Sequence, residues 1–383
     1  MTASRGPFRT TAPGTAALPS HGRVHNLALV LQTLHSAGPM SRADLSRALG
    51  LTRVTVSDLV AELLERSHVI ELGQSEKVRP GKPAILVDVN RRGLQIIGLD
   101  LAENSVLRGA VLDLDGNILH RTETVTSQEK GEEVTQLVLD LVRKTIDAAT
   151  APLLGIGVGT PGIVDSDGQV LTAPNLEWSN VPLRELLESM TGLPTLVSND
   201  ADAAVLAEYT FGGGADDMIL VKIGRGVGSG LMVNGQRARG VHSAAGEIGH
   251  VVVGTDGGVD CTCGKEGCLE TWLSVPSLER GLAAAASSPT PDAAADQVLQ
   301  TAGERLAVAL APIIGALDLA EVVLSGPTHL LDGSLRGSVE KTLTARMLPQ
   351  RPPRIAIRLT QEPQDVVLRG TAVMVLWNQL GVA

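Results

Sequence analysis

The chain has 383 residues, of which 43% are hydrophobic and 19% charged, a composition typical of a globular protein with two or three cores. No run of eighteen apolar residues occurs, so the sequence predicts no membrane-spanning helix. The net charge is −10, yet residues 1–95 hold 12 Lys and Arg against 7 Asp and Glu. This local positive charge suggests that only the first quarter of the chain binds a polyanion. The alternative is a chance clustering of surface charge.

The first twenty residues are rich in Thr, Ala, Pro, Ser and Gly and lack the apolar segment of a secretory signal. A segment of this composition buries little apolar surface, which predicts a disordered tail over residues 1–20. The chain's three cysteines also show no sign of a disulfide framework. Together these features lead us to expect a cytoplasmic protein.

Apolar residues at helical spacing predict a first helix over Val24–Ala37. Ser41 and Asp44 form a capping box at the start of a second helix, which ends at Leu49, and Thr52 is placed to cap a third. A helix, a short turn and a second helix make up the helix-turn-helix arrangement.

Two short strands are predicted after the third helix, near Val69–Leu72 and Ala84–Val89, with a basic loop between them. This pattern predicts a winged helix-turn-helix domain over residues 21–89. The third helix and the wing are expected to contact DNA through Arg53, Thr55, Ser57, Lys77, Arg79 and Lys82. The alternative is a helical protein-interaction module whose basic residues are merely solvated.

The rest of the chain consists of two similar blocks, the second beginning at Met218. Strands are predicted at Gln95–Asp100, Ser105–Asp113, Ile118–Thr124, Leu153–Gly159, Met218–Ile223 and Gly228–Val233. A long helix is expected over Gly131–Ala149, and a C-terminal helix over about Pro363–Gln379 should pack back on the first block. The repeated order indicates two α/β lobes with a ligand site in the cleft between them.

All three cysteines stand together at Cys261, Cys263 and Cys268, eleven residues after His250. Three thiolates and one imidazole form a closed four-ligand set for structural zinc, and binding of that kind is coupled to folding. Unliganded thiols, a disulfide or a redox pair are the alternatives, although a disulfide framework normally has an even number of cysteines.

Five motifs resemble, in order, those of the ROK family of repressors and sugar kinases, and the resemblance covers about residues 24 to 383. They are Gly159-Thr-Pro-Gly162, Ala173-Pro-Asn175-Leu, Ser198-Asn199-Asp200, Gly246-Glu247-Ile-Gly-His250 and the cysteine segment that ends in Glu270. The resemblance implies an α/β fold of two actin-like, RNase H-type lobes. The first lobe would comprise residues 90–210 plus 363–383, and the second, with the zinc knot, residues 211–362. The winged helix is typical of the family's repressor branch.

The resemblance also implies which residues face a sugar in the cleft: Asn175, Asn199, Asp200, Glu247, His250 and Glu270. In the family's kinases, the residue that matches Asp200 is the general base for the attacking sugar hydroxyl. Each residue taken singly could instead form a capping or core hydrogen bond. Asn199 and Asp200, for example, could simply begin a helix.

Such kinases have two phosphate-binding loops, and only one of them has a glycine-rich counterpart in this sequence. Gly224–Gly230 has alternating glycines suited to phosphate, but Asp100–Asn104 replaces the glycines of the other loop with side chains. We therefore expect no enzyme, with Asp200 a vestigial base.

The expected function is a sugar-responsive regulator, most simply a repressor, that binds double-stranded operator DNA as a homodimer or homotetramer and does not contact a membrane. An ATP-dependent sugar kinase with a DNA-binding domain is the alternative. A repressor whose signal is another protein is a third possibility.

Overall fold

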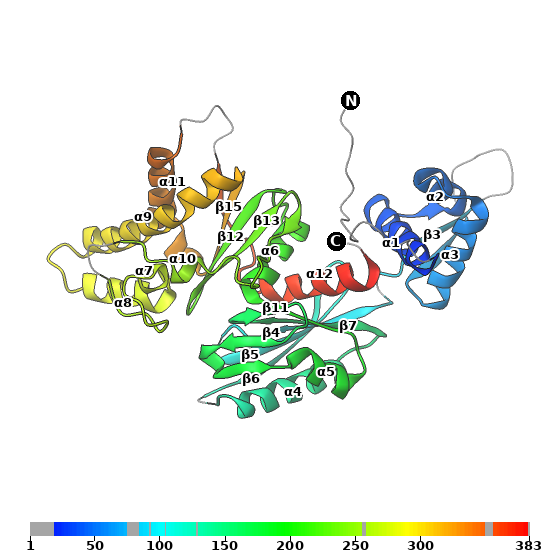
Figure 1. The fold of residues 1–383 in the computed structure, drawn as a ribbon, viewed down its shortest axis with the longest axis horizontal. Helices are drawn as coiled ribbons and strands as arrows, with labels where there is room; N and C mark the ends of the chain where they lie inside the picture. The colour runs from blue at the N-terminus through cyan, green and yellow to red at the C-terminus, as the bar shows by residue number, and fades with distance from the viewer. Residues whose placement is uncertain are drawn as a thin grey trace. The chain divides into compact units, whose positions relative to one another are not determined.

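The computed structural model describes residues 19–74, 84–91, 93–103, 105–127, 129–254, 258–348 and 355–381 (Figure 1). The chain separates into two compact units. The first runs to Asn90 and includes Leu380, and the second extends from Arg91 to Gln379. Within the described ranges, no helix is both long enough and apolar enough to cross a membrane.

The first unit has the predicted winged helix-turn-helix topology. Its elements are α1 (Pro19–Ala37), β1 (Met40–Ser41), α2 (Arg42–Leu49), α3 (Arg53–Glu65), β2 (Val69–Gln74) and β3 (Ile85–Val89), with the strands ordered β1-β3-β2. The predicted caps form, because Ser41 Oγ accepts from the Asp44 amide and Thr52 Oγ1 from the Thr55 amide, both at 3.1 Å. The first helix begins at Pro19, so the last two residues of the predicted tail are helical instead.

The second unit begins with a lobe built on a five-stranded sheet. The elements of this lobe are β4 (Gln95–Asp100), β5 (Val106–Leu112), β6 (Ile118–Val125), α4 (Glu132–Asp147), β7 (Leu153–Thr160), β8 (Ile163–Val164), β9 (Val170–Ala173), the 3₁₀ turn η1 (Pro174–Leu176), β10 (Trp178–Val181), α5 (Leu183–Thr191), β11 (Thr195–Asn199) and α6 (Asp200–Phe211). Strands β8, β9 and β10 form a separate small sheet.

The other lobe contains a second five-stranded sheet and most of the remaining helices. Its elements are β12 (Met218–Ile223), β13 (Val227–Val233), β14 (Gln236–Arg237), η2 (Ile248–His250), α7 (Leu269–Leu273), α8 (Val275–Ala285), α9 (Pro291–Leu317), β15 (Glu321–Ser325), α10 (Thr328–Leu331), α11 (Ser334–Arg346) and β16 (Ala356–Leu359). The chain then continues into α12 (Val366–Leu380).

The two sheets have the same strand topology. Their orders are β11-β7-β4-β5-β6 and β16-β15-β12-β13-β14, each with an antiparallel three-strand meander and two further parallel strands. This repeat confirms the duplicated α/β architecture that the sequence predicts.

Helices α6 and α12 lie between the two sheets (Figure 1). On the α12 side, a Cβ added at Gly98 of β4 or at Gly157 of β7 would lie within 2.6 Å of Thr371. On the α6 side, a Cβ at Gly230 of β13 would lie 2.5 Å from the Ala201 carbonyl. Glycine therefore lets each helix approach the backbone of a sheet, and the N-terminus of α6 is fixed where the two lobes meet.

Gly370 of α12 makes the closest of these backbone approaches and therefore provides a test of the packing. A Cβ at this position would lie 1.8 Å from the Ala203 carbonyl oxygen of α6, whereas a Cβ on the exposed helical Gly337 would meet nothing within 4 Å. We expect Gly370→Ala to lower the free energy of unfolding by about 1–3 kcal/mol through overpacking. Gly337→Ala should instead be neutral or stabilising by up to about 1 kcal/mol. Urea unfolding measures both, and equal effects would contradict the packing.

Candidate functional site

The exposed start of α3 is the candidate DNA-contacting surface of the first unit. Arg53 and Ser57 are exposed as predicted, whereas Thr55 is half-buried and its hydroxyl lies 2.9 Å from that of Thr52. The sequence pattern did not single out Val54, which is 71% exposed between these polar residues and is suited to apolar contact with a thymine methyl group. The predicted contacts Lys77, Arg79 and Lys82 lie outside the described residues.

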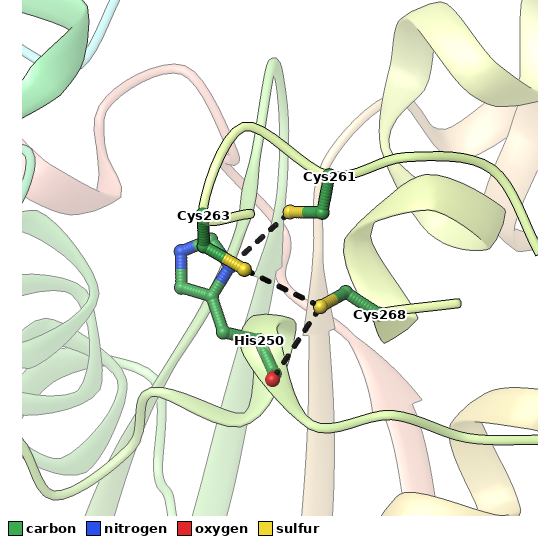
Figure 2. A group of neighbouring side chains, drawn as sticks. All are labelled: His250, Cys261, Cys263 and Cys268. Atoms are coloured by element: carbon green, nitrogen blue, oxygen red, sulfur yellow. Dashed lines mark hydrogen bonds between the residues drawn. The ribbon is translucent and has the colours of Figure 1, made fainter. Parts of the chain in front are cut away.

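The structure brings His250, Cys261, Cys263 and Cys268 together, with one ligand atom of each within 4.8 Å of all the others. Cys263 Sγ and Cys268 Sγ are 3.6 Å apart, and Cys261 Sγ lies 3.5 Å from His250 Nδ1 (Figure 2). A tetrahedral ion with metal–sulfur bonds near 2.3 Å requires sulfur separations of about 3.8 Å. The four residues therefore fit a metal ion, and the three cysteines are not disulfide-bonded.

Burial raises the pKa of the Cys268 thiol to about 12, and the neighbouring cysteines add to this effect. The pKa of the Cys263 thiol is instead lowered, chiefly by a backbone hydrogen bond from Lys265. The pKa shifts therefore differ between the cysteines, and the fit to a metal ion rests on the proximity of the four ligand atoms.

The segment that carries His250 lies directly on strand β13. A Cβ at Gly246 or at Gly249 would lie 2.0 Å from a backbone carbonyl of β13, that of Ser229 or Val227 respectively. The Ser229 amide also donates to the Gly246 carbonyl at 3.0 Å. The two glycines of this motif thus permit backbone contact, which joins the metal cluster to the glycine-rich segment beside the cleft.

A cavity of about 130 Å³ between the lobes contains all six predicted sugar-binding residues. They line it together with Lys222, Thr262, the segment Gly224–Gly228, which includes Arg225, and residues of the Pro161 and Pro174 turns. The carboxylates among them can accept from sugar hydroxyls, and the asparagine amides can both donate and accept.

Two of these residues, Asn199 and Glu270, also hold the cavity walls in place. Asn199 caps α6 by accepting from the Ala201 amide at 2.8 Å, and its side-chain amide donates to the Gly162 carbonyl at 2.9 Å. Glu270 Oε2 accepts from the Val227 amide at 2.9 Å. Glu247 is largely desolvated, and burial raises the pKa of its carboxyl. The helix-capping alternative for Asn199 is therefore realised, in a residue that also faces the cavity.

Asp200 is the first residue of α6, and its carboxylate forms an ion pair with Lys222 Nζ at 2.9 Å. Burial alone would lower the pKa of Lys222, but the charges of Asp200 and the nearby buried Asp100 outweigh it and raise that pKa. Sequence reasoning missed Lys222, since a lysine in an otherwise apolar strand gives no local sign of its partner. The ammonium offsets negative charge at the base of the cavity.

Comparison with known proteins agrees with this geometry. The ROK family profile matches residues 96–378, and that of the bacterial regulatory proteins of the crp family matches residues 39–67. The chain belongs to the ROK family.

Two relatives and one solved structure represent the repressor and kinase branches. The chain is 35% identical to the xylose repressor of Caldicellulosiruptor bescii over 262 residues. The match covers 66% of this chain and 64% of the repressor, which is somewhat less than two thirds of the repressor's length. It is 38% identical to the glucokinase of Halalkalibacterium halodurans over 191 residues, 48% of this chain and 58% of that one. The crystal structure of a ROK family transcriptional regulator, homologous to the E. coli MLC protein, superposes with a TM-score of 0.81 at 25% identity, covering 94% of this chain and 98% of that one.

The metal cluster predicts a specific difference between two histidines. His250→Asn should abolish metal binding and lower the melting temperature, because binding at such a site contributes on the order of 10 kcal/mol to folding. His242 is exposed and is not among the four clustered residues, so His242→Asn is the matched control and should retain the metal. Atomic emission and thermal melts with and without a chelator measure both effects. Metal retained at one ion per chain in His250→Asn would contradict the assignment.

Proposed function

We propose that this protein is a sugar-responsive transcriptional repressor. It binds operator DNA as a homo-oligomer through the winged helix-turn-helix unit, and a sugar in the interlobe cleft weakens that binding. The observation that carries the proposal is the presence, in one chain, of a winged helix-turn-helix fold and a polar cavity that contains all six predicted sugar-binding residues. Similarity to xylose repressors supports it.

The proposed response requires a sugar to bind one conformation of the protein better than another. A coupling free energy of about 1–3 kcal/mol would weaken operator binding by roughly 5- to 150-fold. Fluorescence anisotropy of the protein on DNA from its own upstream region, titrated with sugars at fixed salt, tests this directly. The proposal fails if DNA binds but no sugar, free or phosphorylated, releases it.

We further propose that the metal is structural zinc, because three thiolates and one imidazole form a closed set with no open position for substrate. His250 would bind zinc through Nδ1, which faces the sulfurs, and leave Nε2 at the opposite edge of the ring (Figure 2). Zinc would hold the segment that carries Glu247 and His250 against β13.

Two contacts support a binding protein over a kinase. Lys222 occupies an oxygen of Asp200, the carboxylate that would have to accept the hydroxyl proton. Glu103, in the segment where the family's kinases have glycines, forms an ion pair with Arg108 at 3.1 Å. The glucokinase relatives and the Gly224–Gly230 run favour the alternative of an ATP-dependent sugar kinase. Sugar-dependent release of ADP in a coupled assay would establish that alternative.

The DNA contact is tested at Arg53. Its exposed guanidinium at the start of α3 is suited to a base edge or a phosphate, so Arg53→Ala should weaken operator binding by about 1–3 kcal/mol. Lys341→Ala, in α11 of the second unit, is a charge-matched control and should leave affinity unchanged. Anisotropy at constant salt gives both dissociation constants. Equal affinities for Arg53→Ala and the wild type would place the DNA-contacting surface elsewhere.

The sugar contact is tested at Asp200. Asp200→Asn removes the charged acceptor and should reduce sugar affinity by about 1.5–3 kcal/mol while DNA binding persists. Asp167→Asn, at an exposed aspartate that is not among the cavity-lining residues, is the control. Calorimetry measures sugar binding, and anisotropy measures DNA binding and release. A variant that still responds fully to sugar would remove Asp200 from the site.

A further inference from the structure

A second hollow adjoins the sugar cavity, and the two share Asn175 and Arg225 as a common wall. Its volume is about 610 Å³, against about 130 Å³ for the sugar cavity. Small-molecule sites in proteins typically measure about 300–1,000 Å³. The sugar cavity alone falls below this range, and the adjoining hollow falls within it.

The lining of this hollow is suited to a sugar ring. Leu107, Val134 and Leu176 lie behind the hollow and are only 0%, 1% and 2% exposed, so a ring would contact mainly the polar residues of the lining. These polar residues form a rim of Ser105, Thr126, Ser127, Glu129, Lys130, Asn175 and Arg225. Side chains of these types can donate to and accept from sugar hydroxyls.

The walls of the hollow are held by hydrogen bonds. The Gly131 amide donates to the Leu176 carbonyl at 2.8 Å, and Trp178 Nε1 donates to the Gly131 carbonyl at 3.0 Å. Lys130 Nζ forms an ion pair with Glu177 at 2.6 Å. These contacts join the start of α4 to the η1 turn that carries Asn175. The hollow is therefore formed in advance, which lowers the entropic cost of binding.

We propose that the effector is a two-ring sugar, with one ring in the cavity beside Asp200 and the second in the hollow of Leu107, Val134 and Leu176. This inference rests on the proposed function and specifies the class of ligand. Asn175 and Arg225 lie where the two spaces meet, next to the glycosidic linkage. Lys222 is paired with Asp200 and Lys130 with Glu177, so neither lysine calls for an anionic group on the ligand.

The test compares single sugars with their disaccharides by calorimetry on the full-length protein. The probes are xylose with xylobiose, and glucose with cellobiose and maltose. At least one disaccharide should bind ten-fold or more tightly than its monosaccharide. Ser105→Trp, at an exposed residue of the rim, should block the hollow, remove that advantage and leave monosaccharide affinity unchanged. Ser127→Trp is a second, independent block on the same rim.

The outcomes separate this inference from the proposed function. A monosaccharide that binds as tightly as every disaccharide overturns the two-ring ligand and leaves the sugar-responsive repressor in place. Tight disaccharide binding that both tryptophan variants retain also overturns it, because the second ring would then lie elsewhere. If no sugar of either length binds, the proposed function fails and the inference fails with it.

Discussion

The close approach of α6 and α12 to the two sheets is the constraint on which the cleft depends. Glycines in β4, β7 and β13 give the helices access to the sheet backbone, and Gly370 lets the helices contact each other. Bulkier residues there would separate the layers by more than packed cores tolerate. Since α6 begins with Asp200, this packing fixes the carboxylate at the base of the cavity.

Close backbone packing also fixes the other side of the cavity, where the metal cluster lies. Gly246 and Gly249 place the segment before the cysteines directly on β13, and Glu270 accepts from the Val227 amide at the start of the same strand. The glycine-rich segment, the His250 and cysteine cluster and the carboxylates that line the cavity therefore form one connected structure. A metal bound at the cluster would order the segment that carries Glu247, and His250 of the cluster itself lines the cavity.

Sequence patterns predicted the features that local chemistry determines. The caps Ser41 and Thr52, the long periodic helices and most strands of the two large sheets could be located from spacing alone. Strands β1, β11 and β14 and the small sheet of β8, β9 and β10 were missed, because strands of two to five residues carry little periodic signal and depend on distant partners. The glycine run was interpreted as a phosphate loop, yet Gly230 is required for the packing of α6, which no local pattern reveals.

Lys222 shows how a contact between residues far apart in the sequence can change the chemistry of a motif such as Ser198-Asn199-Asp200. Without its ammonium, Asp100 and Asp200 would place two carboxylates close together beneath the cavity, and burial already raises the pKa of Asp100. The lysine stabilises both charges, and by occupying an oxygen of Asp200 it competes with any hydroxyl proton for that oxygen. A carboxylate paired in this way can still accept a hydrogen bond from a sugar hydroxyl through its other oxygen. The proposed sugar would then be bound through that other oxygen, whereas the proton transfer that a kinase requires at the paired oxygen would have to displace the lysine.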